Sequence, residues 1–128
     1  MTKIMTSYVV ADQISNDLIS LDDEVLISEK AWRMEGSRMF IEAGKRVSVL
    51  DLLKGIIIQS GNDASVAIAE YAGGTERGFV DLMNAYASSL NLENTMFQNS
   101  TGLPDDNHFS SAKDLAILTS DFIKKFPD

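Results

Sequence analysis

With 128 residues, of which 45% are hydrophobic, the chain can form one folded domain or a large part of one and is too apolar to remain disordered. Its formal net charge of -8 argues against a nucleic-acid partner, because an acidic chain repels the phosphate backbone. The absence of cysteine excludes disulfides, thiolate metal sites and cysteine nucleophiles, and the single histidine cannot form a metal cluster alone, so we expect no metal and no cofactor.

The first third of the chain is expected to combine one helix with short strands. Apolar residues recur at helical spacing from residue 1 to about residue 14, and Lys3 lies beside this stripe. A polar, turn-rich stretch covers residues 15–22. Trp32 is interpreted as an anchor of the core. Three short apolar runs are interpreted as strands, at residues 25–27, 38–41 and 46–47.

The remaining two thirds predict four helices and one long loop, with capping residues at their boundaries. Ser48 and Ser111 each precede an aspartate by three residues, which is the spacing of a capping box. Glycines at 73–74 end one helix, and Thr75 begins the next. His108, in the long loop, is expected to be exposed to solvent. The predicted helices cover residues 49–59, 64–71, 75 to about 90 and 112–126, and the loop covers residues 91–109.

Ser60-Gly61-Asn62 interrupts the helical pattern between the first two of these helices. The next helix begins near Asp63, which is expected to cap it, so the three residues form a short connection. One interpretation is structural, because Ser60 and Asn62 are both good capping residues. The other is catalytic, because a stiff connection between packed helices holds side chains in the fixed positions that an active site needs.

Lys3 favours the catalytic interpretation. In a Ser-x-x-Lys pattern at the start of a helix, the two side chains share one face, and a lysine made neutral by burial and by the helix dipole can accept the proton of the serine. Lys3 occupies the fourth position of this pattern and Met1 the second, so the nucleophilic serine is expected just before Met1. The alternative for a lone lysine in a first helical turn is a solvated surface charge.

Many stretches of the chain resemble the D-alanyl-D-alanine carboxypeptidases, which are the low-molecular-mass penicillin-binding proteins of serine peptidase family S11. The resemblance runs in order along essentially the whole chain. Its longest and most specific stretch, residues 53–64, contains the Ser-x-Asn motif. The other stretches lie at residues 2–10, 29–32, 36–40, 94–95 with Phe97, 101–104 and 110–116.

The resemblance implies a fold and a domain assignment. The family has an antiparallel sheet flanked by helices, with a helical subdomain beside the sheet. The chain is therefore expected to be mainly α, the helical subdomain of a β-lactamase/transpeptidase-like α/β fold, with a minor β element near residues 24–47. Residues 1–128 would form a partial domain that lacks both the nucleophilic serine and the C-terminal sheet with its Lys-Thr-Gly motif.

The resemblance also implies a reaction and a role for each matching residue. The family removes the terminal D-alanine of the peptidoglycan pentapeptide through an acyl-enzyme, and β-lactams acylate the same serine. Lys3 matches the general base, and Ser60 matches the serine thought to relay a proton to the leaving amine. Asn62 matches the asparagine that holds the peptide carbonyl of the substrate and orients the lysine. Without nucleophile and carboxylate site, this chain alone is expected to be inactive.

The resemblance implies a location as well. The family works in the periplasm, at the outer face of the inner membrane. No signal peptide is visible in this chain, because no basic run precedes an apolar core and a small-residue cleavage site. If the natural protein is exported, we expect the signal to lie upstream of this chain. Met1, where the family often has leucine, further suggests a start assigned inside a longer gene or a broken gene.

Two other interpretations stay open. One is a non-catalytic helical module or decayed fragment, in which the faces left bare by the missing sheet favour self-association. The other, less favoured, is a fragment of a class A β-lactamase. Those enzymes usually carry Ser-Asp-Asn where this chain has Gly61 in the middle position, together with a deacylating glutamate in a downstream loop that is not evident here.

Overall fold

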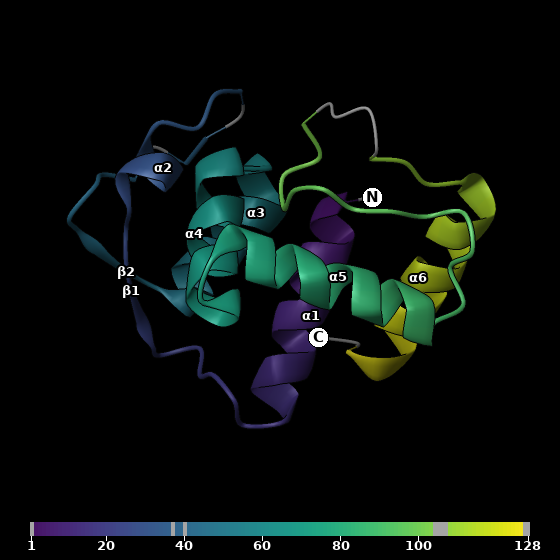
Figure 1. Cartoon of the computed structure of the whole chain (residues 1–128). Coiled ribbons are helices and arrows are strands. Elements are labelled where there is room, and N and C mark those ends of the chain that lie inside the picture. Colours follow the sequence, from purple (N-terminus) through teal and green to yellow (C-terminus); the bar gives the residue numbers. More distant parts are fainter. Residues whose placement is uncertain (1, 37, 40, 104–107, 127–128) are drawn as a thin grey trace.

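The computed structural model describes residues 2–36, 38–39, 41–103 and 108–126, and this part of the chain is mainly helical (Figure 1). The expected fold class, mainly α with a minor β element near residues 24–47, is confirmed. The regular elements are α1 (Thr2–Ser15), β1 (Glu24–Leu26), α2 (Glu29–Trp32), β2 (Arg46–Ser48), α3 (Val49–Gln59), α4 (Asn62–Gly73), α5 (Glu76–Ser89) and α6 (Ala112–Lys125).

The central helix of the molecule is α1. It contacts α3, α4, α5 and α6, and Figure 1 shows it crossing behind α5. Most of its length is buried, including Tyr8 and Val9 on the expected apolar stripe and Ser7 and Val10 beside it. A helix buried round most of its circumference has little room for charge, so Lys3 in its first turn needs a separate explanation.

The connection between α3 and α4 is short, as the sequence predicts. α3 begins with Ser48 as its N-cap, whose Oγ accepts a hydrogen bond from the backbone N–H of Asp51 at 3.1 Å. Only Ser60 and Gly61 separate α3 from α4, which begins at Asn62. Small buried side chains let the first turns of α4 pack closely against its neighbours α2, α3 and α5.

The expectation that Asp63 is the N-cap of α4 is wrong, because Gly61 holds that position, although Oδ1 of Asp63 does accept the first-turn N–H of Ala64 at 2.8 Å. Asp63 lies inside the helix, and its carboxylate accepts hydrogen bonds from the backbone N–H groups of Met39 (2.9 Å) and Ile41 (3.3 Å). These bonds use the donors that a strand would pair with a neighbouring strand. The described residues of the run 38–41 accordingly form no strand, and Phe40 lies outside the described residues.

The small sheet and α2 lie on one side of the molecule, opposite α6 (Figure 1). β1 and β2 pair antiparallel over their full length, so the strands predicted at 25–27 and 46–47 are confirmed within one residue. The prediction that Trp32 anchors the core is wrong, because its side chain is 46% exposed. α2 is only four residues long and buries Ala31 instead.

The chain between α5 and α6 is fixed at both of its ends. Met96 and Phe109 form an antiparallel bridge across it. Asp114 of α6 is buried, and its Oδ2 accepts hydrogen bonds from the backbone N–H of Asn94 (2.8 Å) and the hydroxyl of Thr95 (2.6 Å). These contacts tie the two ends of the loop to each other and to the first turn of α6.

Four aromatic rings join α1, α5 and α6. Tyr8 packs edge-to-face against Tyr86, Phe122 and Phe126, with ring centroids 5.6 to 5.9 Å apart, and we call these four residues the aromatic cluster. Such pairs stabilise a core by about 0.5 to 1.5 kcal/mol each beyond the burial of their area. The aromatic cluster therefore ties the central helix to both helices of the C-terminal half.

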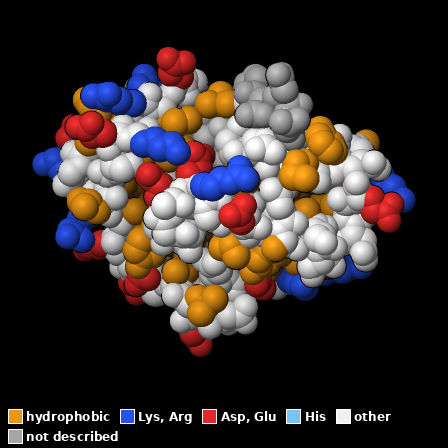
Figure 2. All heavy atoms as spheres, in the orientation of Figure 1, with side chains coloured by type: hydrophobic (Ala, Val, Ile, Leu, Met, Phe, Trp, Pro, Cys, Tyr) orange, Lys and Arg blue, Asp and Glu red, His pale blue; other side chains and the backbone are white. Residues whose placement is uncertain are grey.

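The surface carries charges of both signs. On the face shown in Figure 2, acidic and basic side chains lie interspersed, although the chain as a whole has a net charge of -8. Among the described residues, no helix combines the length and the apolar character that crossing a membrane requires.

Candidate active site

An open pocket of about 590 Å³ lies at the N-terminal end of α1. A smaller hollow of about 280 Å³ adjoins it, shares Lys3, Ile4 and Ser60 with it, and is otherwise mostly apolar. The structure thus brings Lys3 and Ser60, from distant parts of the sequence, to one pocket. The larger pocket is lined by Thr2, Lys3 and Ile4 of α1, by Ser60, and by Phe97, Thr101, Gly102, His108, Phe109 and Ser110 of the loop before α6.

Lys3 has the environment of a lysine that can act as a base. Its side chain is half-buried, and this burial lowers the pKa of its ammonium group below the ordinary value. Within the described part of the chain no carboxylate lies at ion-pair distance from Lys3 to oppose the effect. The first turn of a helix also disfavours a positive charge, so Lys3 loses its proton more readily here than a lysine at an ordinary surface site.

Ser60 is held in a conformation that is unusual for a residue with a side chain. Its φ of 49° lies in the left-handed region, and the backbone N–H groups of Ser60 and Gly61 both point to the carbonyl of Gly55. A non-glycine residue in this region costs about 1 to 3 kcal/mol, and such strain is typical of functional sites. Within the described residues its exposed hydroxyl forms no hydrogen bond, so it is available to a ligand.

Asn62 is buried and does not line the pocket. Its Nδ2 donates a hydrogen bond to the backbone carbonyl of Glu35 at 2.7 Å, whereas its Oδ1 has no partner among the described residues. Gly36, at a φ of 80°, passes so close that a Cβ there would meet Nδ2 at 2.7 Å. The amide therefore has a fixed orientation, with one acceptor unused.

The capping interpretation is confirmed for the backbone of Ser60, which is the C-cap of α3 and donates its N–H to the carbonyl of Gly55, but it does not explain the two side chains. Gly61 is the N-cap of α4 and makes no side-chain cap. The side chain of Asn62 bonds to a segment outside the helix, and the hydroxyl of Ser60 caps no helix end within the described residues. Because neither side chain serves a helix, the catalytic interpretation of the pair gains support.

The expectation that His108 is exposed is wrong. The ring is half-buried and lies edge-on against Phe97, with Nε2 2.7 Å from Oγ1 of Thr2 and with Nδ1 accepting from the backbone N–H of Gln98 at 3.0 Å. In the neutral imidazole this leaves the proton on Nε2, which then donates to Thr2. His108 thus joins the loop to Thr2, the residue next to Lys3, and no local sequence pattern predicts this contact.

The loop that forms the far wall of the pocket is built around Asn99. Its Oδ1 accepts hydrogen bonds from the backbone N–H groups of Thr101 (3.2 Å) and Gly102 (2.8 Å), which is the pattern of an Asx-turn. The hydroxyl of Thr6 in α1 donates to the carbonyl of Ser100 at 2.9 Å. The wall therefore rests directly on the helix that carries Lys3.

Metal binding finds no support in the geometry. Within the described residues, no three or more side chains of histidine, cysteine, aspartate or glutamate gather in an arrangement that could hold a metal ion. What the pocket offers is a half-buried amine, a free hydroxyl and a polar loop. These are the groups of proton transfer and hydrogen bonding.

Comparison with known proteins supplies the family. The family model described as D-alanyl-D-alanine carboxypeptidase, peptidase family S11, matches residues 1–128. The chain is 47% identical over 124 residues to the D-alanyl-D-alanine carboxypeptidase DacF of Bacillus subtilis, covering 97% of this chain and 32% of that protein. It is 46% identical over 134 residues to DacC of Escherichia coli, covering 100% of this chain and 34% of that protein.

Solved structures agree with the sequence relatives. The crystal structure of the D-alanyl-D-alanine carboxypeptidase DacD from Francisella tularensis matches with a TM-score of 0.97 at 46% identity, covering 99% of this chain and 31% of that one. Penicillin binding protein 5 from Haemophilus influenzae matches with a TM-score of 0.96 at 43% identity, covering 99% of this chain and 38% of that one. The chain belongs to the D-alanyl-D-alanine carboxypeptidase family, peptidase family S11, and spans about a third of the length of the curated relatives it matches.

Proposed function

We propose that this chain is the lysine-bearing helical part of a serine-type D-alanyl-D-alanine carboxypeptidase. Its substrate is the peptidoglycan pentapeptide that ends in D-Ala-D-Ala, and β-lactams acylate the same site. The observation that carries the proposal is the shared pocket in which Lys3, with its lowered pKa, lies together with the strained Ser60. Membership of the family and the bacterial relatives support the substrate and a site of action in the periplasm.

Each residue has a defined part in the proposed reaction. The neutral amine of Lys3 takes the proton from a nucleophilic serine, expected just before Met1, as the serine oxygen bonds to the carbonyl carbon of the penultimate D-alanine. The bond to the terminal D-alanine then breaks, and Ser60 passes a proton to the departing amine. Asn62 would use its free Oδ1 to orient Lys3. Water releases the acyl group from the serine in the second half of the reaction.

Because the nucleophile and the Lys-Thr-Gly motif are not among these 128 residues, we propose that the chain by itself performs no acyl transfer. Incubation of the chain with a fluorescent penicillin, followed by denaturing electrophoresis, should give no labelled band. A stoichiometric covalent adduct on this chain would overturn the assignment, because a serine within it would then be the nucleophile.

A chimaera tests the positive half of the proposal. This chain would replace the matching segment of Escherichia coli DacC, whose remaining two thirds are expected to supply the nucleophilic serine and the sheet. We expect the chimaera to be labelled by penicillin and to release D-alanine from a peptide that ends in D-Ala-D-Ala. The Ser60→Ala variant should lose about 10²- to 10⁴-fold in rate, the range of a lost proton-transfer group, whereas Ser89→Ala in α5 should match the parent. A folded chimaera that is never labelled would refute the proposal.

A second candidate role is a non-catalytic module that self-associates. The observation that favours it is the apolar face of α3, where Ile57 and Ile58 are 70% and 77% exposed. In the carboxypeptidase proposal the rest of a longer protein covers this face. Sedimentation of the chain and of an Ile57→Ser, Ile58→Ser double variant distinguishes the roles, since only a self-associating module gives dimers that the double variant loses.

A further inference from the structure

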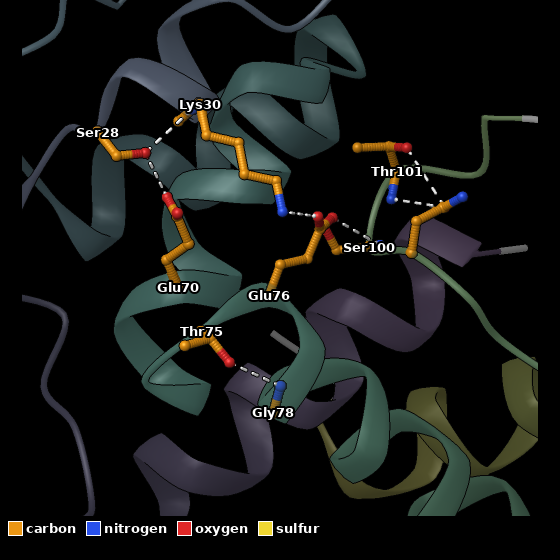
Figure 3. A network of polar contacts seen from close by, with 10 residues as sticks. Ser28, Lys30, Glu70, Thr75, Glu76, Gly78, Ser100 and Thr101 are labelled. Atoms are coloured by element: carbon orange, nitrogen blue, oxygen red, sulfur yellow. Dashed lines mark hydrogen bonds and ion pairs between the residues drawn. The ribbon is translucent and has the colours of Figure 1, made fainter.

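Glu76, the first residue of α5, joins three segments that are far apart in the sequence (Figure 3). Its Oε1 lies 2.8 Å from Nζ of Lys30 in α2. Its Oε2 accepts hydrogen bonds from the hydroxyl of Ser100 (2.9 Å) and from the backbone N–H of Ser100 (3.3 Å). The sequence gives no sign of this role, because an acidic residue after the N-cap Thr75 is ordinary in a first helical turn.

The contact of Glu76 with Ser100 is shielded from water, whereas the ion pair reaches the surface through Lys30, whose side chain is 57% exposed. The side chain of Glu76 is 11% exposed, and Ser100 is fully buried. Burial acts to raise the pKa of Glu76, but the hydrogen bonds from Lys30 and Ser100 outweigh it and hold the pKa below its usual value. Hydrogen bonds to a buried, ionised acceptor are about twice as strong as neutral ones.

Ser100 connects Glu76 to the candidate active site. Its carbonyl accepts the hydroxyl of Thr6, one helical turn after Lys3. The next two residues, Thr101 and Gly102, line the pocket that also holds Lys3. A Cβ placed on Gly102 would lie 3.4 Å from Cβ of Thr2, so the loop passes close enough to the first turn of α1 that one added methyl group would fill the space between them.

The bonds inside the loop cannot replace this attachment. Asn99 binds the backbone of Thr101 and Gly102, and Thr101 accepts from the backbone N–H of Leu103. Such bonds give the loop its shape, but they leave its position relative to α1 unspecified. The position is determined where the loop meets the helices. There Ser100 is hydrogen-bonded both to Glu76 of α5 and to Thr6 of α1.

We propose that Glu76 is a positioning residue for the candidate active site: by holding Ser100 against α5, it fixes Thr101 and Gly102 as the wall of the pocket that contains Lys3. Glu76 touches no substrate and acts only through the loop. The catalytic consequence rests on the proposed function, whereas the mechanical part, that Glu76 fixes the loop, does not.

The first experiment tests, on the chain itself, whether Glu76 fixes the loop. Amide hydrogen exchange of Ser100 and Gly102 is followed by NMR in the parent, in Glu76→Gln and in Glu70→Gln. Glu70 is the matched control, since its carboxylate accepts a hydroxyl bond from Ser28 at 2.6 Å in the same view but holds no pocket residue. We expect exchange in Glu76→Gln to rise by about tenfold or more, the effect of losing about 1.4 kcal/mol, and to stay unchanged in Glu70→Gln.

Should Glu76→Gln fail to fold, Ser100→Ala carries the same test, because it removes the hydroxyl bond to Glu76 and leaves the pair with Lys30 intact. Its exchange at Gly102 should rise in the same direction by a smaller factor. Equal exchange at Gly102 in the parent and in the altered chain would overturn the proposal.

The second experiment measures the consequence in the DacC chimaera. We expect the second-order rate of acylation by penicillin to fall about tenfold in Glu76→Gln relative to Glu70→Gln, when both are measured well below their unfolding temperatures. If the parent chimaera is never acylated, the proposed function fails and the exchange data still decide the role of Glu76. If the parent is acylated and the two variants react equally fast, the positioning role alone fails.

Discussion

The first turn of α1 and the aromatic cluster around Tyr8 differ in whether their polar groups have partners. At the first turn, Lys3 is half-buried without a carboxylate among the described residues, and the nearby Ser60 is strained with its hydroxyl free. In the aromatic cluster, which begins five residues further along α1 at Tyr8, the Tyr8 hydroxyl donates to Asp121 and the Tyr86 hydroxyl donates to Asp12. At the first turn the Lys3 amine and the Ser60 hydroxyl have no partner among the described residues, whereas both tyrosine hydroxyls of the aromatic cluster are paired.

The pKa values of two lysines shift in opposite directions and illustrate this difference. Burial lowers the pKa of Lys3. The pKa of Lys125 is raised, first by its hydrogen bond with the hydroxyl of Tyr8 and then by the charges of Tyr8 and Asp121. An unpaired polar group at a pocket destabilises the fold slightly but can react with or bind a ligand. A paired group stabilises the fold and is not available for reaction. The comparison predicts that substitutions in the two regions affect different quantities.

Lys3→Met should give the largest effect on reactivity with almost none on stability. In the DacC chimaera we expect acylation by penicillin to fall about 10²- to 10⁴-fold, because the base that receives the proton of the nucleophile is lost. The free energy of unfolding should change by no more than about 0.5 kcal/mol, since an unpaired, half-buried charge is replaced by an apolar side chain. Parallel labelling and urea unfolding measure both quantities. An acylation rate within twofold of the parent would contradict the assignment of Lys3 as the base.

Tyr8→Ala should give the largest loss of stability, on the order of 3 to 5 kcal/mol, because a fully buried ring is removed from three edge-to-face contacts. Urea unfolding of the chain, followed by circular dichroism, measures it. Tyr8→Phe is the matched control, which keeps the ring and loses only the hydroxyl with its contacts to Asp121 and Lys125, at a cost of about 1 to 2 kcal/mol. If the alanine variant costs no more than the phenylalanine variant, the aromatic cluster is not what holds α1 to α6.

The two regions should also give opposite slopes of stability against pH. Burial, and then Asp12, raises the pKa of Tyr86, so the folded chain keeps this proton at a pH where the unfolded tyrosine, with a pKa of about 10, has lost it. The stabilisation from Tyr86 is complete below about pH 10 and is lost as the pH rises further. The lowered pKa of Lys3 acts the other way, because the unfolded state binds that proton more tightly and stability rises with pH up to about 10.4.

Unfolding free energies between about pH 7 and pH 11 measure these slopes. We expect Tyr86→Phe to weaken the alkaline loss of stability and Lys3→Met to make the net loss steeper, because the opposing contribution of Lys3 is gone. Parallel curves for the parent and both variants would show that neither group changes its pKa on folding.

The helices could be predicted from the sequence because their signals are local. Ser48, Thr75 and Ser111 each accept a hydrogen bond from a backbone N–H three residues ahead, as the sequence indicates. Trp32 could not be placed in this way, because the short helix α2 offers only one position that faces the core, and Ala31 occupies it. Large apolar residues are exposed often enough that composition alone does not decide such a case.

The carboxylates that fix the loops could not be predicted at all. Asp63, Glu76 and Asp114 all stand in a first helical turn, where acidic residues serve the helix itself. In the structure each one also binds the backbone of a segment distant in sequence: Asp63 binds Met39 and Ile41, Glu76 binds Ser100, and Asp114 binds Asn94. Their partners are determined by packing between elements, which has no local pattern.

The sequence predicted the candidate residues Lys3 and Ser60 but not the residues that form the other walls of the pocket. Lys3 and Ser60 match short motifs of a known family, and the fold brings them to one pocket. The remaining walls come from the loop of Asn99 to Gly102 and from His108, whose bonds depend on how that loop folds back on α1. The sequence alone favoured an exposed His108, because a polar loop with no partner in view has no reason to be buried.

The smallest effect is expected at the rim of the aromatic cluster. The Nζ of Lys125 lies 3.5 Å from Oδ2 of Asp121 and 5.7 Å from the centre of the Tyr8 ring, but its side chain is 53% exposed. Exposed ion pairs contribute about 0.2 to 1 kcal/mol, so Lys125→Met should cost about 0.5 kcal/mol or less. At about 1 M salt even this cost should vanish, since charges are screened beyond about 3 Å. Lys124→Met, at the same helix end, is the matched control. A cost above about 2 kcal/mol that survives salt would mean that charge pairing, and not the packing of the rings, stabilises this end of the molecule.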